Sequence, residues 1–151
     1  RGFYVLLWKP QKNAFFLTRQ LNQPGGATLP NFFPMILPIY FAAMSILPGL
    51  IQVESRGNAC AYNAKEDAAG CLQIRPIMVR EAQRLGIDFT LDDRWNCEKS
   101  MGLFIAIQMV KGRTDPEAMA RCWNGGPKGM EKESTLHYWE AVKKANQNQT
   151  R

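Results

Sequence analysis

The chain has 151 residues, of which 46% are apolar and 21% are charged, and its formal net charge is +6. This length allows one domain with a sizeable core, and the composition excludes an intrinsically disordered chain. The positive charge favours an anionic partner. However, the basic residues form no run and are not interleaved with aromatic residues, so we expect no binding of nucleic acid.

The first 34 residues differ in pattern from the rest of the chain. Two strand-like apolar runs at 3–8 and 14–18 are separated by a candidate turn at 9–13, which predicts a short β-hairpin. The sequence Gln-Pro-Gly-Gly at 23–26 then breaks any regular element. We expect residues 1–44 to be an N-terminal extension, and the sequence leaves its role open.

Residues 32–51 form an uncharged apolar run that is about long enough to span a bilayer. Three prolines (Pro34, Pro38 and Pro48) interrupt this run, and no basic residue directly flanks it. We interpret it as the first, buried helix of the domain together with the segment that leads into the helix. A membrane anchor is the less favoured alternative. The helix should end near Glu54, because the following Ser-Arg-Gly-Asn sequence tolerates the turn after a helix.

The remaining elements are predicted to be helices. Pro76 suits the first turn of a helix that Gly86 ends, and Asn96 is a candidate cap for a helix over 97–111. That helix is apolar on nearly all sides, which indicates a buried central helix. A capping box, Thr114-x-x-Glu117, predicts the start of the next helix, and a final helix should run from 134 or 135 to about 146. The fold class is therefore mainly α, with a polar tail at 147–151.

Glu54 is the candidate catalytic residue that the helical pattern itself indicates. It follows an apolar helical run, so one side of its carboxylate should face a core, and burial raises the pKa of a carboxyl group. A raised pKa suits a general acid that works near neutral pH. The alternative is an exposed residue at a helix C-terminus, where the helix dipole disfavours a negative charge.

Four cysteines (Cys60, Cys71, Cys97 and Cys122) allow three disulfide pairings. No two of them have the spacing of a zinc ligand pair, and the chain has a single histidine, so we expect no metal site. We expect at least one pair to be close enough to bridge, and a bridge between Cys60 and Cys71 would restrict the loop between them. Disulfides would suit a protein that works outside the cytoplasm, whereas free core thiols remain the alternative.

Four short motifs occur in order along the last two-thirds of the chain. They are Glu54-Ser55-x-Gly57-Asn58, Ala69-Gly70-Cys71-Leu72-Gln73-Ile74, Cys122-Trp123-Asn124-Gly125-Gly126-Pro127 and Thr135-x-x-Tyr138. Together they resemble the motifs of the lytic transglycosylase (SLT) domain, which belongs to the lysozyme-like superfamily. The sequence departs from the usual pattern at Leu72, Trp123 and Gly125, where the family usually has Met, Tyr and Ala.

The resemblance implies a lysozyme-like helical catalytic domain over residues 45–146 that cleaves peptidoglycan and needs no cofactor. The bond cut would be the β-1,4 bond between MurNAc and GlcNAc. Glu54 would act first as acid and then as base, closing a 1,6-anhydro ring on the muramic acid, and the Tyr138 hydroxyl would point at its carboxylate. The residues expected to contact substrate are Gly70, Gln73, Trp123 and Asn124. A structural role is open for each of them, namely a loop junction, a turn or core packing.

Several alternatives to this function remain. Asp67 is a candidate second acid, which would make the protein a lysozyme-type hydrolase, although an Asp in a polar loop is usually solvated. A protein of another class would be a non-catalytic glycan-binding module or a phage virion module. The expected partner is a peptidoglycan glycan strand, bound by a monomer. The expected location is the cell envelope or the outside of the cell, with the gene carried by a bacterium or a bacteriophage.

Overall fold

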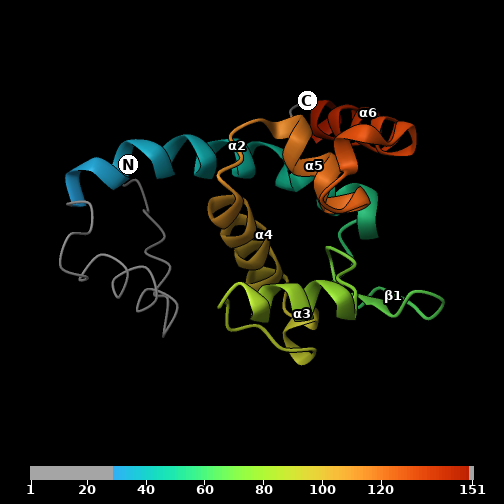
Figure 1. Cartoon of the computed structure of the whole chain (residues 1–151). Helices are drawn as coiled ribbons and strands as arrows, with labels where there is room; N and C mark the ends of the chain where they lie inside the picture. Colours follow the sequence, from blue (N-terminus) through green and yellow to red (C-terminus); the bar gives the residue numbers. More distant parts are fainter. Residues whose placement is uncertain (1–28, 150–151) are drawn as a thin grey trace, which may run out of the picture.

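The structure is a computed structural model that describes residues 29–149, with side chains from residue 36 onward, and it is mainly helical. Figure 1 shows the long helix α2 (Leu29–Ser55) along the top and α6 (Glu133–Gln149) against its end. The other helices are α3 (Pro76–Arg84), α4 (Cys97–Lys111) and α5 (Pro116–Gly125), with the 3-10 turns η1 (Asp92–Trp95) and η2 (Gly129–Glu131). The hairpin expected at 3–18 lies outside the described residues.

Helix α2 is the element on which the others pack, and it contacts α4, α5 and α6. The half that carries Ile46, Leu47 and Leu50 is buried in the core. The preceding turns expose Tyr40 and Phe41, so the expectation of a fully buried helix is wrong for that part. Residues Ile36–Ser55 are long and apolar enough to cross a membrane by length and composition, criteria that the core helix of a soluble protein also meets.

Helices α2 and α6 are in close contact at Gly49, which follows Pro48 within α2. The Asn146 side chain accepts a hydrogen bond from the Gly49 N–H (2.6 Å) and donates one to the Ser45 carbonyl (2.9 Å). These two backbone groups are i and i+4 partners in a regular helix. The amide of Asn146 therefore binds two backbone groups of α2, one on each side of Pro48.

The caps of α4 and α5 show how short polar residues set the helix boundaries. Asn96 caps α4 as predicted, because its Oδ1 accepts from the Lys99 N–H at 3.0 Å. The cap of α5 is Asp115, whose carboxylate accepts from the backbone N–H groups of Glu117 and Ala118. The predicted capping box on Thr114 is therefore wrong by one residue, because Asp115 offers the stronger charged acceptor next to Pro116.

The segment between α2 and α3 contains a small hairpin that the sequence did not indicate. Strands β1 (Tyr62–Asn63) and β2 (Ala68–Ala69) pair antiparallel, with Tyr62 opposite Ala69. A disulfide joins Cys71, which follows the hairpin in the sequence, to Cys97 at the start of α4, with a Cα–Cα distance of 5.6 Å. The prediction of at least one bridged pair is confirmed. The Cys60–Cys71 pairing is wrong, since Cys60 is an exposed free thiol and Cys122 is a half-buried one.

The ends of the long helices differ from the domain limits expected from the sequence. Helix α2 runs through residues 44 and 45, so the expected boundary between extension and domain falls inside one continuous helix. Helix α6 extends to Gln149, into the stretch expected to be a polar tail. The extension and the domain are thus joined by helical backbone.

Candidate active site

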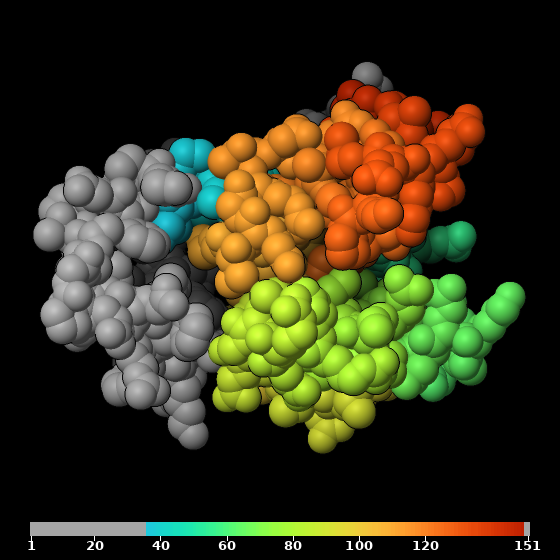
Figure 2. Space-filling view, in the orientation of Figure 1, coloured from blue at the N-terminus to red at the C-terminus, as the bar shows by residue number. Residues whose placement is uncertain are grey.

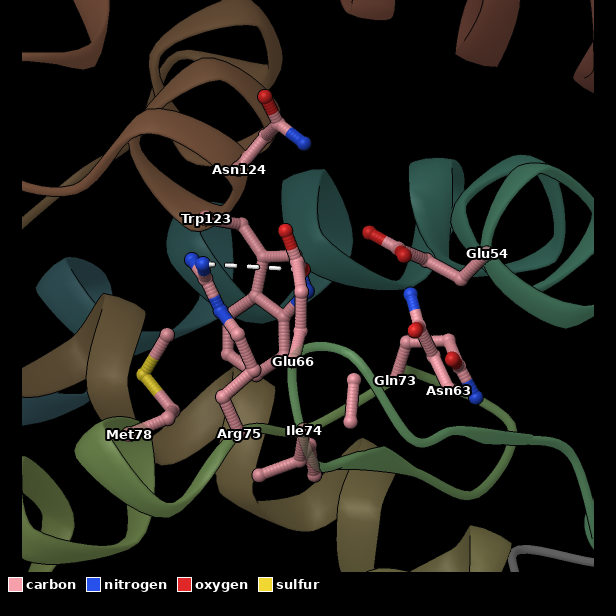
Figure 3. A pocket seen from close by; sticks show the side chains of 10 residues that line it. Glu54, Asn63, Glu66, Gln73, Ile74, Arg75, Met78, Trp123 and Asn124 are labelled. Carbon is pink, nitrogen blue, oxygen red and sulfur yellow. Dashed lines mark ion pairs between the residues drawn. The ribbon is translucent and has the colours of Figure 1, made fainter.

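A cleft of about 350 Å³ lies where the C-terminal end of α2 meets the hairpin, the start of α3 and the end of α5. Figure 2 shows the α5–α6 side of the molecule and the segment from β1 to α3 meeting along a furrow. Polar groups dominate the lining, which comprises Glu54, Asn63, Glu66, Ala68, Gln73, Ile74, Arg75, Met78, Trp123 and Asn124. Figure 3 shows these side chains converging from α2, from the hairpin and the segment after it, from α3 and from α5.

Glu54 reaches the cleft from the last turn of α2, and its carboxylate points into the open space (Figure 3). Burial raises the pKa of this carboxyl group from 4.5 to about 7. A hydrogen bond from Tyr138 and the positive charge of Arg75 oppose this rise, and the negative charge of Glu66 adds to it. At neutral pH, Glu54 is therefore present in both protonated and ionised forms, which suits a group that donates and then accepts a proton.

Tyr138 lies on α6 and donates a hydrogen bond from its hydroxyl to Oε1 of Glu54 at 2.6 Å. Burial and the negative charge of Glu54 raise the pKa of Tyr138 far above its usual range, so the phenol remains a donor at any working pH. The hydroxyl lies where the resemblance implies. Its hydrogen bond orients the carboxylate and favours the ionised form of Glu54.

The backbone around Gln73 forms the floor of the cleft. The Gln73 side chain donates to the carbonyl groups of Ala61 (3.1 Å) and Gly70 (2.9 Å), and its own backbone has a φ of 46°. The Ser55 hydroxyl donates to the Cys71 carbonyl at 2.9 Å, which ties the end of α2 to the same segment. Gln73 thus lines the cleft while its side chain holds the loop.

Gly70 directly follows β2 and is not among the residues that line the cleft. Its φ is +79°, and a Cβ atom at this position would lie 1.8 Å from the backbone oxygen of Arg94. The glycine is therefore required for close packing of η1 against the hairpin. Of the two readings that the sequence allowed for Gly70, the geometry favours the loop junction.

Trp123 and Asn124 enter the cleft from the end of α5. The Trp123 ring is almost fully buried and packs edge to face on Phe104, with a centroid distance of 5.2 Å. One edge of a core tryptophan therefore forms a wall of the cleft, where it offers apolar surface. Asn124 is exposed and lines the cleft, where its amide offers both a donor and an acceptor.

The structure brings Glu66, and not Asp67, into the cleft with Glu54. The Asp67 backbone carbonyl accepts from the Arg94 guanidinium at 2.7 Å, and its carboxylate pairs with the same group at 3.3 Å. Asp67 is therefore held by Arg94 and does not line the cleft. Glu66 forms an ion pair with Arg75 at 3.8 Å on the wall of the cleft, drawn as a dashed line in Figure 3.

Sequence reasoning missed Asn63, Arg75 and Met78 as residues of the cleft. Arg75 follows directly after the motif that contains Gln73, so its position in the sequence was a signal that could have identified it. Asn63 had no such signal, because its place depends on the two-residue strand β1. Among the described residues, no group of three or more His, Cys, Asp and Glu side chains is arranged to hold a metal ion.

No family model, curated protein or solved structure matches this chain.

Proposed function

We propose that the protein is a peptidoglycan lytic transglycosylase with a lysozyme-like fold, which acts on the MurNAc–GlcNAc bond. The observation that carries this proposal is the pair formed by Glu54 and Tyr138 in a polar cleft. A carboxyl group with a pKa of about 7 is held by a phenol at 2.6 Å. The order of the four motifs along the chain supports the same function.

The first step uses the protonated form of Glu54. Its proton passes to the glycosidic oxygen as the bond to C1 of the muramic acid breaks, and positive charge develops on the sugar ring. The resulting carboxylate is stabilised by the hydrogen bond from Tyr138 and by the positive charge of Arg75. The leaving saccharide departs with the donated proton.

The second step uses the same carboxylate as a base. It accepts the proton of the muramic acid 6-hydroxyl while O6 bonds to C1, and this closes the 1,6-anhydro ring and restores the protonated Glu54. A single carboxyl group is enough for both steps, since the nucleophile belongs to the substrate. A raised pKa helps here too, because a more basic carboxylate accepts the proton more readily.

Hydrolysis is the second candidate, and one observation favours it. Glu66 lines the same cleft as Glu54, and its charge is close enough to raise the pKa of Glu54. A second carboxylate in that position could activate a water molecule, as in a glycosidase that uses two acids. In that case the products would end in reducing MurNAc and carry no anhydro ring.

The test is digestion of purified sacculi, followed by mass spectrometry of the released muropeptides. We expect anhydro-muropeptides from the wild type and from Glu66→Gln. Glu54→Gln should lose nearly all turnover, because the amide keeps the shape of the side chain but has no proton to donate. The control is Glu98→Gln, which removes an exposed carboxylate on α4.

Three outcomes would contradict the proposal. Reducing MurNAc as the product would make the protein a hydrolase. Glu54→Gln activity within about tenfold of the wild type, equivalent to roughly 1.4 kcal/mol of barrier, would exclude Glu54 as the acid. Binding of sacculi by the wild type without any turnover would indicate a non-catalytic module. The Cys71–Cys97 disulfide supports a place of action outside the cytoplasm.

A further inference from the structure

Arg75 holds a fixed place at the rim of the cleft. The preceding residue, Ile74, is buried and bridges to Ala69 through two backbone hydrogen bonds. The following residue, Pro76, begins α3, and the Arg75 carbonyl accepts from the N–H groups of its first turn. The backbone on both sides is therefore held, and the side chain extends from a rigid base into the cleft.

The guanidinium of Arg75 is less engaged than those of the two buried arginines. Its ion pair with Glu66 spans 3.8 Å, and the two side chains are 42% and 53% exposed. A charge-assisted hydrogen bond is about 1 Å shorter. By contrast, Arg94 and Arg121 are buried and donate at 2.7 Å to the Asp67 carbonyl and the Glu117 carboxylate. Those two arginines hold the fold together, whereas Arg75 retains donors for a ligand.

The charge of Arg75 acts on the reacting part of the cleft, since it lowers the pKa of Glu54. The sugar on which Glu54 acts would be a muramic acid, which differs from N-acetylglucosamine by a lactyl arm on O3. That arm ends in a carboxylate, or it continues into a stem peptide that carries carboxylates. An arginine that lines the same cleft as the acid is suited to bind such a group, because its fork of N–H donors matches a carboxylate.

We propose that Arg75 binds a carboxylate carried by the lactyl arm of the muramic acid at the scissile bond. The ion pair with Glu66 is exchanged for the substrate when the strand binds. The cleft thereby selects acidic glycans over neutral ones such as chitin oligosaccharides. This inference rests on the proposed function and adds the specificity determinant of the same site.

The test compares Arg75→Gln and Arg75→Lys with Arg80→Gln, which removes an exposed charge on α3, the helix that follows Arg75. Four soluble substrates are needed: strands with stem peptides, strands stripped by an amidase so that the lactyl carboxylate is free, and both preparations with their carboxylates amidated. KM and kcat are measured on each substrate. Binding is measured by calorimetry with Glu54→Gln, alone and combined with Arg75→Gln.

We expect Arg75→Gln to raise KM roughly tenfold or more on carboxylated strands. On amidated strands it should have no effect, because the wild type has already lost the same interaction there. Arg75→Lys should raise KM on carboxylated strands less than Arg75→Gln does, and Arg80→Gln should have the KM of the wild type. A larger effect on stripped strands would identify the lactyl carboxylate as the ligand, and a larger effect on intact strands would identify a carboxylate of the stem peptide.

Two outcomes would overturn the inference. One is an unchanged KM for Arg75→Gln on the carboxylated strands, together with equal binding by Glu54→Gln and by the double variant Glu54→Gln with Arg75→Gln. The other is an equal loss on carboxylated and amidated strands, which would give Arg75 a role in tuning Glu54 or in structure. The proposed function is contradicted by a different result, namely no turnover by the wild type. In that case the calorimetric comparison of Glu54→Gln with the double variant still tests whether Arg75 binds the carboxylate.

Discussion

The side-chain amide of Asn146 lies against the backbone of Gly49 and accepts its N–H at 2.6 Å. A Cβ atom on Gly49 would lie 2.5 Å from the Val142 carbonyl and 2.6 Å from Oδ1 of Asn146. Real Cβ atoms do not approach backbone oxygens this closely. Glycine at position 49 therefore sets the distance between α2 and α6.

Gly49→Ala is expected to destabilise the protein by about 1–3 kcal/mol, because the added methyl group overpacks the contact with α6. Helix propensity alone predicts the opposite, since Ala is better than Gly in a helix by about 1 kcal/mol. Urea unfolding followed by circular dichroism measures the difference. The control is Phe41→Ala on the same helix, where the side chain is 65% exposed and the change should be small. A gain in stability for Gly49→Ala would show that α6 can move away at little cost.

Tyr138→Phe should shift the pH dependence of activity and lower the maximal rate. The hydrogen bond from Tyr138 lowers the pKa of Glu54, so its loss should raise that pKa above about 7. Because the first step needs the protonated acid, the alkaline limb of the rate should move to higher pH. The rate at the optimum should fall about tenfold to a hundredfold, because the carboxylate loses a hydrogen bond to its charged form.

Rates of sacculus digestion between pH 5 and 9 test this expectation. Tyr40→Phe, on the exposed face of α2, is the matched control and should leave the profile unchanged. An alkaline limb that stays in place, or moves to lower pH, would mean that Tyr138 does not act on Glu54.

Glu54 should lower the stability of the fold at neutral and alkaline pH. The pKa of its carboxyl group is about 7 in the folded protein, against 4.5 ordinarily. Below pH 4.5 both states hold the proton and the group has no effect. As the pH rises from 4.5 to 7 the unfolded chain releases the proton first, which favours unfolding, and above pH 7 the full cost remains.

Glu54→Gln should therefore be more stable than the wild type at pH 8, by as much as about 3 kcal/mol, and equal to it at pH 4. Unfolding free energies at the two values measure this difference. Glu98→Gln, on the surface of α4, should show no such dependence on pH. Equal stability of Glu54→Gln and the wild type at pH 8 would contradict burial as the cause of the raised pKa.

The disulfide between Cys71 and Cys97 should account for much of the stability of the hairpin side of the cleft. It closes a loop with a sequence separation of 26, for which chain entropy predicts about 3.5 kcal/mol. Cys71→Ala with Cys97→Ala should lower the urea midpoint accordingly, and a reductant should lower the wild type to the same value. Cys60→Ala, at an exposed free thiol, should change neither value. A wild type that is insensitive to reductant would show that the bridge contributes little.

Local signals in the sequence predicted the helices, but they could not fix everything that shapes the cleft. Asn96, Pro76 and the turn after Ser55 mark helix ends through their own backbone preferences, and the structure follows them. The strands β1 and β2 have two residues each, too few for an alternating pattern to appear. Asn63 owes its place in the cleft to this hairpin, and so its position was not visible in the sequence. The hairpin also decides that Glu66, and not its neighbour Asp67, faces Glu54, which the order of two adjacent acids in a loop does not reveal.

The pairing of Glu54 with Tyr138 was predictable only from the order of the motifs. The two residues are 84 positions apart, and no periodicity relates α2 to α6. Arg75 was overlooked for another reason. An arginine before a proline looks like an ordinary solvated residue at a helix start, and only the meeting of four elements makes it part of a wall.

The packing of α6 on α2 has a consequence for how the protein is made. A ribosome completes α2 before α6, because α2 precedes α6 in the sequence. Until α6 has emerged, the nascent chain holds the Glu54 carboxylate without its phenol, and Gly49 faces solvent instead of Asn146. A chain truncated before residue 138 would therefore contain every residue that lines the cleft and still lack the hydroxyl that binds the Glu54 carboxylate. Competence for the reaction would therefore arise only once α6 has packed on α2.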